Sequence, residues 1–363
     1  MRPQRHVALL SLVAGGITAF SLVAFAATGI AQAIDSPQRI AFQISTGSTT
    51  GSYFPVGQLL AQLLSHPPGV GRCQAADVCG PAGLIVSTRA SEGSIANVTA
   101  VNSRNVSSGI AQTDVVALAV AGKGPFAKAG PAKQLRVIAN LYGEDLHLLA
   151  AKNANIKSVA DLRGKRVSLS SEGSGTINTA RAILAAYRLT ERTIVPNYDS
   201  GERATDLLQN GKLDAMFYVG GTPASLIEQL LDEGVAVLIP INGEARTRLL
   251  RAQPHLYAHT IPQGTYSGSD TVETVAVDAV WITDASQPDS LIYGVAKSLF
   301  NPANRTTLNA ERVGAHFLEL EVAAKGATAP LHPGAARYFM EAGVLDRPPQ
   351  APPPQPPSRG TLR

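Results

Sequence analysis

Hydroxyl-bearing residues and glycines crowd one short loop near the amino-terminal end of the chain, at residues 46–53. Glycine lets the backbone turn sharply and approach a ligand, and hydroxyl groups donate hydrogen bonds. The helix expected after this loop adds unpaired N–H groups that carry partial positive charge, so the loop suits a carboxylate or a phosphate. The predicted ligand-binding residues are Thr46, Gly47, Ser48, Thr49, Thr50, Gly51, Ser52 and Tyr53. Alternatively, the loop is an ordinary strand-to-helix connection whose hydroxyls cap the helix. It lacks the lysine and the spacing of a P-loop, which disfavours nucleotide hydrolysis.

A second loop, at residues 171–176, repeats this chemistry between another expected strand and helix. It predicts contacts to an anion or a polar head group from Ser174, Gly175 and Thr176. Asn178 stands where a dinucleotide-binding fingerprint would have its third glycine, so the loop predicts no nucleotide cofactor.

A third strand-to-helix junction adds the hydroxyl of Ser91 and the carboxylate of Glu92 beside the first loop. Glu92 would pair with an amino group of a ligand if the helix starts surround a cleft. Alternatively, Glu92 is an ordinary glutamate in the first turn of the helix, a position that the helix dipole favours.

Motifs of common enzyme classes are missing from the sequence, since neither Gly-x-Ser-x-Gly nor His-Glu-x-x-His occurs. His255 and His259 have the spacing of two metal ligands on a helix, but Pro254 interrupts the segment and no glutamate follows His255, which predicts surface histidines. His147 and His332 are expected to be structural. We therefore predict no catalytic residues, no metal site, no cofactor and no enzymatic activity.

The two cysteines, Cys73 and Cys79, lie close together in a segment rich in proline and glycine. In a non-reducing compartment they would close a small loop, so a disulfide is predicted. A metal site is the rival interpretation, but the spacing lacks a second pair of ligands and His66 is the only histidine nearby.

The first 33 residues have the pattern of an export signal. Arg2 and Arg5 precede an uncharged apolar run at residues 7–31, and Ala31-Gln32-Ala33 offers a small-x-small site for cleavage after Ala33. An uncleaved membrane anchor is the alternative, because the run is long enough to span a bilayer. No second run approaches that length, so a periplasmic location is predicted for the remainder.

The net charge excludes some partners. The formal charge of +4, from 31 basic and 27 acidic residues, falls to +2 when the two leader arginines are removed. This excess is too small to draw the chain to nucleic acid or to anionic lipid, so neither partner is predicted.

The elements that must position these loops alternate between short β-branched strands and amphipathic helices, which predicts an α/β fold with a mainly parallel sheet. Two long extended segments, at residues 135–151 and 271–283, stand where the chain would leave one lobe and later return to it. The predicted parts are a leader at 1–33, a first lobe at 38–144 plus 276–345, a second lobe at 145–275, and a proline-rich disordered tail at 346–363. A cleft between two lobes could close on a ligand about the two crossing segments.

The order of these motifs resembles a known family, the extracytoplasmic solute-binding proteins of tripartite ATP-independent periplasmic (TRAP) transporters, in the subgroup named TAXI. The likeness spans nearly all of residues 38–342. The segments that carry it are Ser45-Thr46-Gly47-Ser48-Thr49-Thr50-Gly51-Ser52-Tyr53-Phe54-Pro55, Gly93-Ser94-Ile95-Ala96-Asn97, Ala111-Gln112-Thr113-Asp114, Leu146-His147-Leu148, residues 158–167, Gly173-Ser174-Gly175-Thr176, residues 214–219, residues 261–266 and residues 330–335.

This resemblance implies a two-lobed type II periplasmic binding fold, a clamshell whose hinge is formed by the two crossing segments. It implies capture of a small organic anion or amino acid, such as glutamate or another dicarboxylate-like solute, and delivery to a TRAP membrane permease. It also adds Gln112, Phe217 and Tyr218 to the predicted site. Glu92 and the long segment at residues 66–81 depart from the family pattern.

Other functions on the same scaffold stay open at this level. A periplasmic sensor subunit that signals to a membrane kinase would need the same clamshell, and an exported enzyme would need an acid in the cleft, for which Glu92 is the only candidate. The chain is expected to act as a monomer, since delivery to a permease needs no second copy.

Overall fold

The computed structural model describes residues 39–310, 313–314 and 317–346. They belong to one compact unit. The predicted leader and the proline-rich tail lie outside the described residues, so both stay predictions. Within the described part, no helix combines the length and the apolar character that crossing a bilayer requires.

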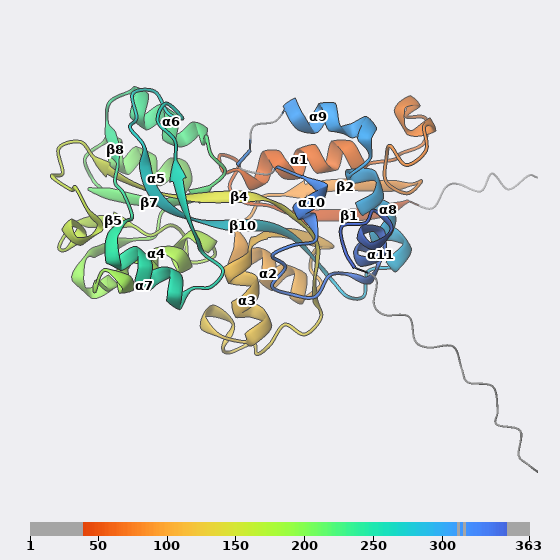
Figure 1. Cartoon of the computed structure of the whole chain (residues 1–363), viewed down its shortest axis with the longest axis horizontal. Helices are drawn as coiled ribbons and strands as arrows, with labels where there is room; N and C mark the ends of the chain where they lie inside the picture. Colours follow the sequence, from red (N-terminus) through yellow and green to blue (C-terminus); the bar gives the residue numbers. More distant parts are fainter. Residues whose placement is uncertain (1–38, 311–312, 315–316, 347–363) are drawn as a thin grey trace, which may run out of the picture. The chain divides into compact units, whose positions relative to one another are not determined.

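Ten strands of the described chain form one sheet in the order β2-β1-β3-β10-β4-β7-β5-β6, with β8 paired to β4 and β9 paired to β10. Figure 1 shows β4 and β10 as the long strands that run side by side through the molecule. The strands are β1 (Ile40–Ser45), β2 (Leu84–Arg89), β3 (Ser108–Gln112), β4 (Leu135–Ala151), β5 (Arg166–Ser168), β6 (Val195–Asn197), β7 (Ala215–Gly220), β8 (Ala236–Leu238), β9 (Tyr257–Ile261) and β10 (Val272–Asp284).

The prediction of a mainly parallel sheet is correct for the outer strands and wrong for the centre. The pairs β1–β2, β1–β3, β5–β6 and β5–β7 are parallel. Strand β10 runs antiparallel to β3, β4 and β9, and β4 runs antiparallel to β7 and β8. The reason is that β4 and β10 cross the molecule in opposite directions, as an outgoing and a returning segment of one chain.

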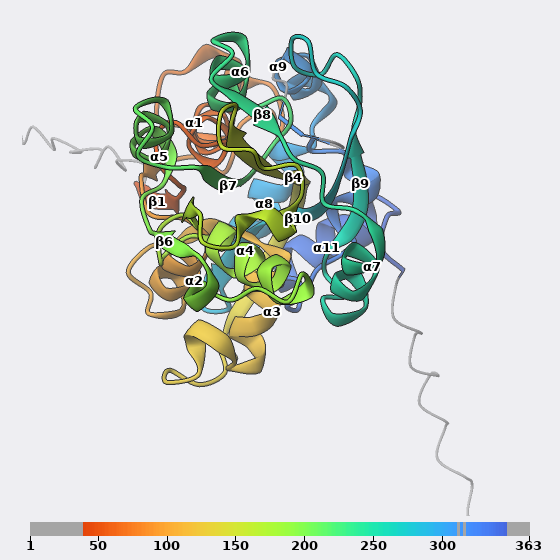
Figure 2. The same cartoon turned by 90° about the vertical axis from the view of Figure 1, so that its left-hand side faces the viewer.

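Helices cover both faces of this sheet, which is why its central strands β3, β4 and β10 are almost wholly buried. Figure 1 shows α1 above and α2 below strands β1 and β2, and Figure 2 shows the same arrangement after a quarter turn. The α-helices are α1 (Tyr53–Leu64), α2 (Ser94–Asn102), α3 (Thr113–Ala121), α4 (Gly175–Ala186), α5 (Gly201–Gln209), α6 (Ser225–Asp232), α7 (Gly243–Ala252), α8 (Asp289–Leu299), α9 (Arg305–Ala310), α10 (Leu320–Ala323) and α11 (Pro333–Glu341). Short 3₁₀ turns are η1 (Gly71–Gln74), η2 (Gly124–Phe126), η3 (Val159–Leu162), η4 (Glu191–Thr193) and η5 (Pro302–Asn304).

Three helices begin at or directly after predicted site residues. Helix α1 begins at Tyr53, the last residue of the predicted 46–53 loop. Helix α4 begins at Gly175 and has Ser174 as its N-cap. Helix α3 follows β3 directly, and Gln112 is both the last residue of the strand and the N-cap of the helix. Because no turn residue separates the two elements, the start of α3 has no local signal in the sequence.

Buried apolar side chains form four clusters. Two of them draw their buried members from residues 42–142 and 279–339, and the other two from residues 146–277. Leu141 and Leu146, only five positions apart on β4, therefore belong to different cores. This division supports the predicted lobe boundaries, which stay a proposal.

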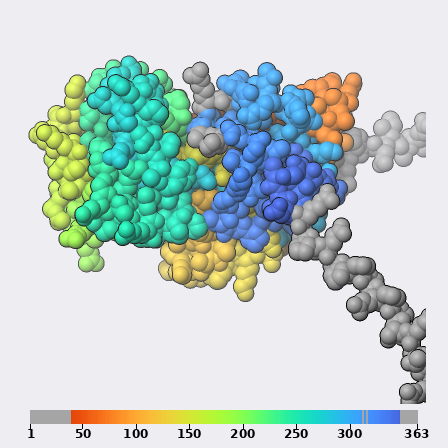
Figure 3. All heavy atoms as spheres, viewed as in Figure 1, coloured from red at the N-terminus to blue at the C-terminus, as the bar shows by residue number. Residues whose placement is uncertain are grey.

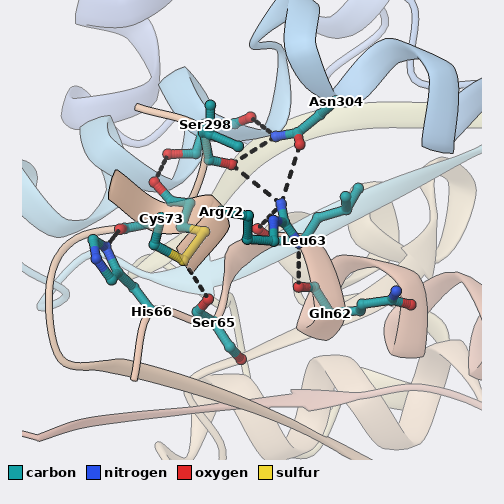
Figure 4. Close-up of a disulfide and its surroundings, with 11 residues drawn as sticks. Gln62, Leu63, Ser65, His66, Arg72, Cys73, Ser298 and Asn304 are labelled. Atoms are coloured by element: carbon teal, nitrogen blue, oxygen red, sulfur yellow. Dashed lines mark hydrogen bonds between the residues drawn. A yellow bond between two sulfur atoms is a disulfide. The ribbon is translucent and has the colours of Figure 1, made fainter. Parts of the chain in front are cut away.

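Cys73 and Cys79 are joined by a disulfide, as the sequence predicts. The looped segment packs against the end of α1, where the Arg72 guanidinium donates hydrogen bonds of 3.0 Å to the Gln62 carbonyl and 3.1 Å to the Leu63 carbonyl (Figure 4). It also contacts η5, because the Asn304 amide donates to the Val78 carbonyl at 2.8 Å. Figure 3 shows the orange surface of this loop beside the blue carboxyl-terminal helices. The disulfide thus closes a loop that caps α1.

Candidate functional site

Four helices begin at the wall of one cavity: α1, α2, α4 and α5. The cavity has a volume of about 80 Å³. Roughly 10–15 Å³ suffices for one water molecule, so the cavity can hold several polar groups. Its lining residues are Gly47, Ser48, Gly51, Ser52, Tyr53, Glu92, Gly93, Ser94, Gln112, Glu144, Ser170, Ser174, Gly175, Thr176, Ser200, Gly201, Tyr218 and Val219.

The helix starts give this cavity its electrostatic character. The first turn of a helix has N–H groups without intrahelical partners, and the aligned peptide dipoles place partial positive charge there. None of the lining residues is a lysine or an arginine. Recognition of an anionic group in this cavity therefore rests on backbone N–H groups and hydroxyls.

Ser174 shows how the sequence builds one of these starts. It is the N-cap of α4, and its Oγ accepts a hydrogen bond of 3.2 Å from the Ile177 N–H. The same hydroxyl donates to the Ser171 carbonyl at 2.7 Å. The side chain is therefore fixed at the cavity wall with its own helix already capped.

The first loop is held by Asn97, a fully buried residue of α2. Its Oδ1 accepts hydrogen bonds of 2.6 Å from both Ser45 and Ser91, while its amide donates to the Thr46 carbonyl and, at 2.7 Å, to the Ile110 carbonyl. One side chain thus ties β1, the 46–53 loop, the 91–94 loop and β3 together.

The loops at 91–94 and 171–176 touch directly. The Glu92 carboxylate accepts a hydrogen bond of 3.0 Å from the Gly173 N–H, and the Ala96 N–H donates to the Gly173 carbonyl at 3.0 Å. Helices α4 and α3 are also joined, because the Asn178 amide of α4 donates to the buried Asp114 carboxylate of α3 at 2.8 Å. Burial raises the pKa of Asp114. Of these residues, Glu92 lines the cavity, and its bond to the Gly173 N–H holds it at the cavity wall.

Glu144 of β4 lines the cavity and is 1% exposed, although it is not among the residues predicted from the sequence. The Tyr53 hydroxyl donates to one of its carboxyl oxygens at 2.9 Å and the Ser52 hydroxyl to the other at 3.3 Å. Burial raises the pKa of Glu144 to about 8, against the lowering effect of these two hydrogen bonds. The available signal was an acidic pair, Glu144-Asp145, in the middle of a long and mostly apolar extended segment.

Gln112 also lines the cavity and is 2% exposed. Its side-chain oxygen has no hydrogen-bond partner in the described part of the chain. Gly175 lies against it, since a side chain at position 175 would collide with the Gln112 amide and approach the Ser94 Oγ to 2.7 Å. The absence of a side chain at 175 is what allows these elements to meet.

The predicted site residues fall into three groups. Those that line the cavity are Gly47, Ser48, Gly51, Ser52, Tyr53, Glu92, Gln112, Ser174, Gly175, Thr176 and Tyr218. Thr49 and Thr50 instead line an adjoining groove of about 660 Å³. Thr46, Ser91 and Phe217 line neither: Thr46 is buried and bonds to the Arg89 carbonyl, Ser91 bonds to Asn97, and Phe217 packs in a hydrophobic cluster.

His147 and His259 each lie within hydrogen-bond distance of another side chain. The Nε2 atom of His147 lies 2.8 Å from the Tyr266 hydroxyl, and burial lowers the pKa of this histidine to about 4. The Nδ1 atom of His259 lies 2.6 Å from the buried Asp145 carboxylate, and the His259 side chain is partly exposed. No group of three or more metal-ligating side chains occurs among the residues that the structure covers.

Three solved structures illustrate the likeness of this fold. MatC from Rhodopseudomonas palustris, solved with bound malate, is 14% identical, with 82% of this chain and 97% of that chain covered and a TM-score of 0.52. The periplasmic binding protein BugD is 11% identical, with 85% and 95% covered and a TM-score of 0.50. The aliphatic sulphonate binding protein SsuA from Escherichia coli is 18% identical, with 83% and 79% covered and a TM-score of 0.43.

The predicted fold class is confirmed: the chain has an α/β fold like that of periplasmic binding proteins. A family model, described as the NMT1-like family, matches residues 44–343, which include every element that lines the cavity. Membership in the TAXI subgroup is a finer prediction than this match. The chain belongs to the NMT1-like family.

Proposed function

We propose that this protein is an exported solute-binding protein that captures a small organic anion or amino acid in the cavity at the four helix starts. The single observation that carries the proposal is the convergence of α1, α2, α4 and α5 on one small polar cavity. Converging helix starts are a ready-made site for a carboxylate, and the cavity wall adds hydroxyls from Ser48, Ser52 and Ser174.

The size and chemistry of the cavity favour binding over catalysis. It is small, and its two acids are already engaged, Glu92 by the Gly173 N–H and Glu144 by two hydroxyls. MatC, which shares the fold, was solved with malate, and a small organic acid of that class would suit the helix starts here. No cofactor is part of the proposed activity.

The proposed place of action is the periplasm, and the proposed partner is a TRAP-type membrane permease. The leader pattern at residues 1–33 supports export, and the disulfide between Cys73 and Cys79 suits an oxidising compartment. The protein would deliver its solute as a monomer. Neighbouring genes test the partner: a many-helix permease supports transport, and a two-component pair would support the sensor alternative.

The binding function is tested by thermal unfolding of the chain purified after periplasmic expression, with and without a panel of dicarboxylates and amino acids. A bound solute at 100 times its Kd should raise stability by about 2.7 kcal/mol. Ser174→Ala should reduce this gain, because the hydroxyl lies at the cavity wall and caps α4. Ser103→Ala, at the exposed end of α2, is the matched control. No stabilisation by any member of the panel would contradict the proposal.

A further inference from the structure

Two buried hydrogen-bond acceptors face the same cavity from different elements. Glu144 comes from β4 and Gln112 from the junction of β3 and α3, and neither side chain is more than 2% exposed. The sequence pattern gave Glu144 no role, and the capture of an anion at helix starts does not use it.

The surroundings of Glu144 contain donors and acids. From α1, Ser52 and Tyr53 donate hydrogen bonds to it. Asp114 of α3 and Asp278 of β10 act on it as like charges. The phenols that interact electrostatically with it are Tyr53, Tyr142 of β4 itself, Tyr218 of β7 and Tyr257 of β9, and the other charged group at the cavity wall is the Glu92 carboxylate. An ionised Glu144 therefore meets no positive charge among these groups.

Gln112 supplies the second observation. Its buried side-chain oxygen is without a partner among the described residues, although buried polar atoms are nearly always paired. An amide oxygen only accepts hydrogen bonds, so what is missing beside it is a donor. Gln112 needs a hydrogen-bond donor, and an ionised Glu144 needs a positive charge, so one ligand group that donates hydrogen bonds and carries positive charge would satisfy both.

We infer that Glu144 and Gln112 form the acceptor end of the site and select a ligand with a protonated amine over the same carbon skeleton without it. This inference rests on the proposed function, since the carboxylate of that ligand would lie at the helix starts. It makes Glu144 and Gln112 specificity-determining residues.

Binding of the ligand amine changes the protonation state of Glu144. The neutral Glu144 carboxyl loses its proton to solvent when the ligand ammonium arrives, and a carboxylate–ammonium pair remains. The raised pKa of Glu144, about 8, means that most of the ligand-free protein holds this proton at pH 7. Binding should then release about one proton at pH 7 and progressively fewer toward pH 9.

The test is titration calorimetry of the full exported protein with two matched pairs of probes, L-glutamate against glutarate and L-aspartate against succinate. Each titration is run at pH 7 in two buffers of different ionisation enthalpy, which gives the number of protons released. We expect the amine-bearing member of at least one pair to bind about 10- to 100-fold more tightly, with release of about one proton.

The variant Glu144→Gln should abolish both the preference and the proton release. Gln112→Leu should reduce the preference and leave the proton release in place. Glu228→Gln, an exposed first-turn residue of α6 that lines neither cavity nor groove, is the matched control for removal of one carboxylate. The pH dependence of proton release in the unmodified protein gives the same information without any variant.

The outcomes separate the two proposals. Equal or tighter binding of glutarate or succinate, or proton uptake on binding, would overturn the inference and leave the proposed function standing. Binding of none of the four probes would overturn the inference, and it would contradict the proposed function as well if no member of the wider panel of dicarboxylates and amino acids stabilised the protein.

Discussion

The Tyr53 hydroxyl of α1 donates a 2.9 Å hydrogen bond to the Glu144 carboxyl of β4, joining residues that lie 91 positions apart. The bond connects the first residue of a helix that begins at the cavity to the long strand that runs between the two groups of hydrophobic clusters. A change in the charge of Glu144 therefore acts on the cavity wall and on the central strand together.

The ligand-free protein should lose stability as the pH rises from 6.5 to 8. Glu144 has a raised pKa of about 8 when folded, and an unfolded carboxyl has already lost its proton in this range, so the folded state binds more protons. The stabilisation present below the unfolded pKa is thus lost as the pH rises toward the folded value. His147, with a folded pKa of about 4, is neutral in the folded protein, but its unfolded form still holds part of a proton near pH 6.5, so it adds a small slope of opposite sign at the low end of this window.

The measurement is chemical denaturation at several pH values between 6.5 and 8.5. A loss of roughly 2 kcal/mol is expected across this interval in the unmodified protein. Glu144→Gln should flatten the dependence. The same slope in the variant would show that another group is responsible.

Gly175→Ala should weaken ligand binding at least about tenfold. The added methyl group would collide with the Gln112 amide and crowd the Ser94 hydroxyl, forcing apart elements that meet at the cavity. Gly71→Ala is the matched control, because a methyl group there meets no atom within 4 Å. Thermal shifts with whichever solute stabilises the unmodified protein measure the effect, and unchanged shifts for Gly175→Ala would contradict this account.

Asn97→Ala should destabilise the protein by about 2–4 kcal/mol, because it leaves buried groups of the 46–53 and 91–94 loops without their shared partner. Urea denaturation measures the loss. Asn105→Ala, at an exposed position just after α2, should change stability by less than about 0.5 kcal/mol. Equal effects of the two substitutions would argue against a central role for Asn97.

Reduction of the disulfide should lower stability by about 2 kcal/mol, the value expected for cross-linking a short loop. The Cys73→Ser/Cys79→Ser double variant should show the same loss and no further response to dithiothreitol. Mass spectrometry of the periplasmic protein should find both thiols oxidised, and free thiols there would remove the disulfide from the account of this loop.

Several features of the fold follow from the sequence because their signals are local. Alternating strands and helices predicted an α/β fold, the extended run at 135–151 predicted β4, and the glycine and hydroxyl loops predicted where helices begin at the cavity. Turn chemistry and periodicity act within a few residues, so a single sequence can show them. The two cysteines paired as expected for the same reason, since they are six positions apart.

Only the tertiary structure decided which side chains meet. Neighbouring residues on a strand point to opposite faces, so Glu144 reaches the cavity while Asp145 pairs with His259 of β9. That choice depends on the register of β4 against β7 and β10, whose residues lie more than 70 and 120 positions away. Nothing local in the sequence fixes this register.

The same limit explains the other differences. Three differences depend on pairings between distant segments. The centre of the sheet is antiparallel, Phe217 packs in a hydrophobic cluster, and Thr46 and Ser91 do not line the cavity. The sequence alone determined that hydroxyls, glycines and helix starts would be available to bind a small polar solute. The tertiary structure decided that a buried carboxyl and an unpaired amide oxygen would face it, because burial and pairing arise only when remote strands come together.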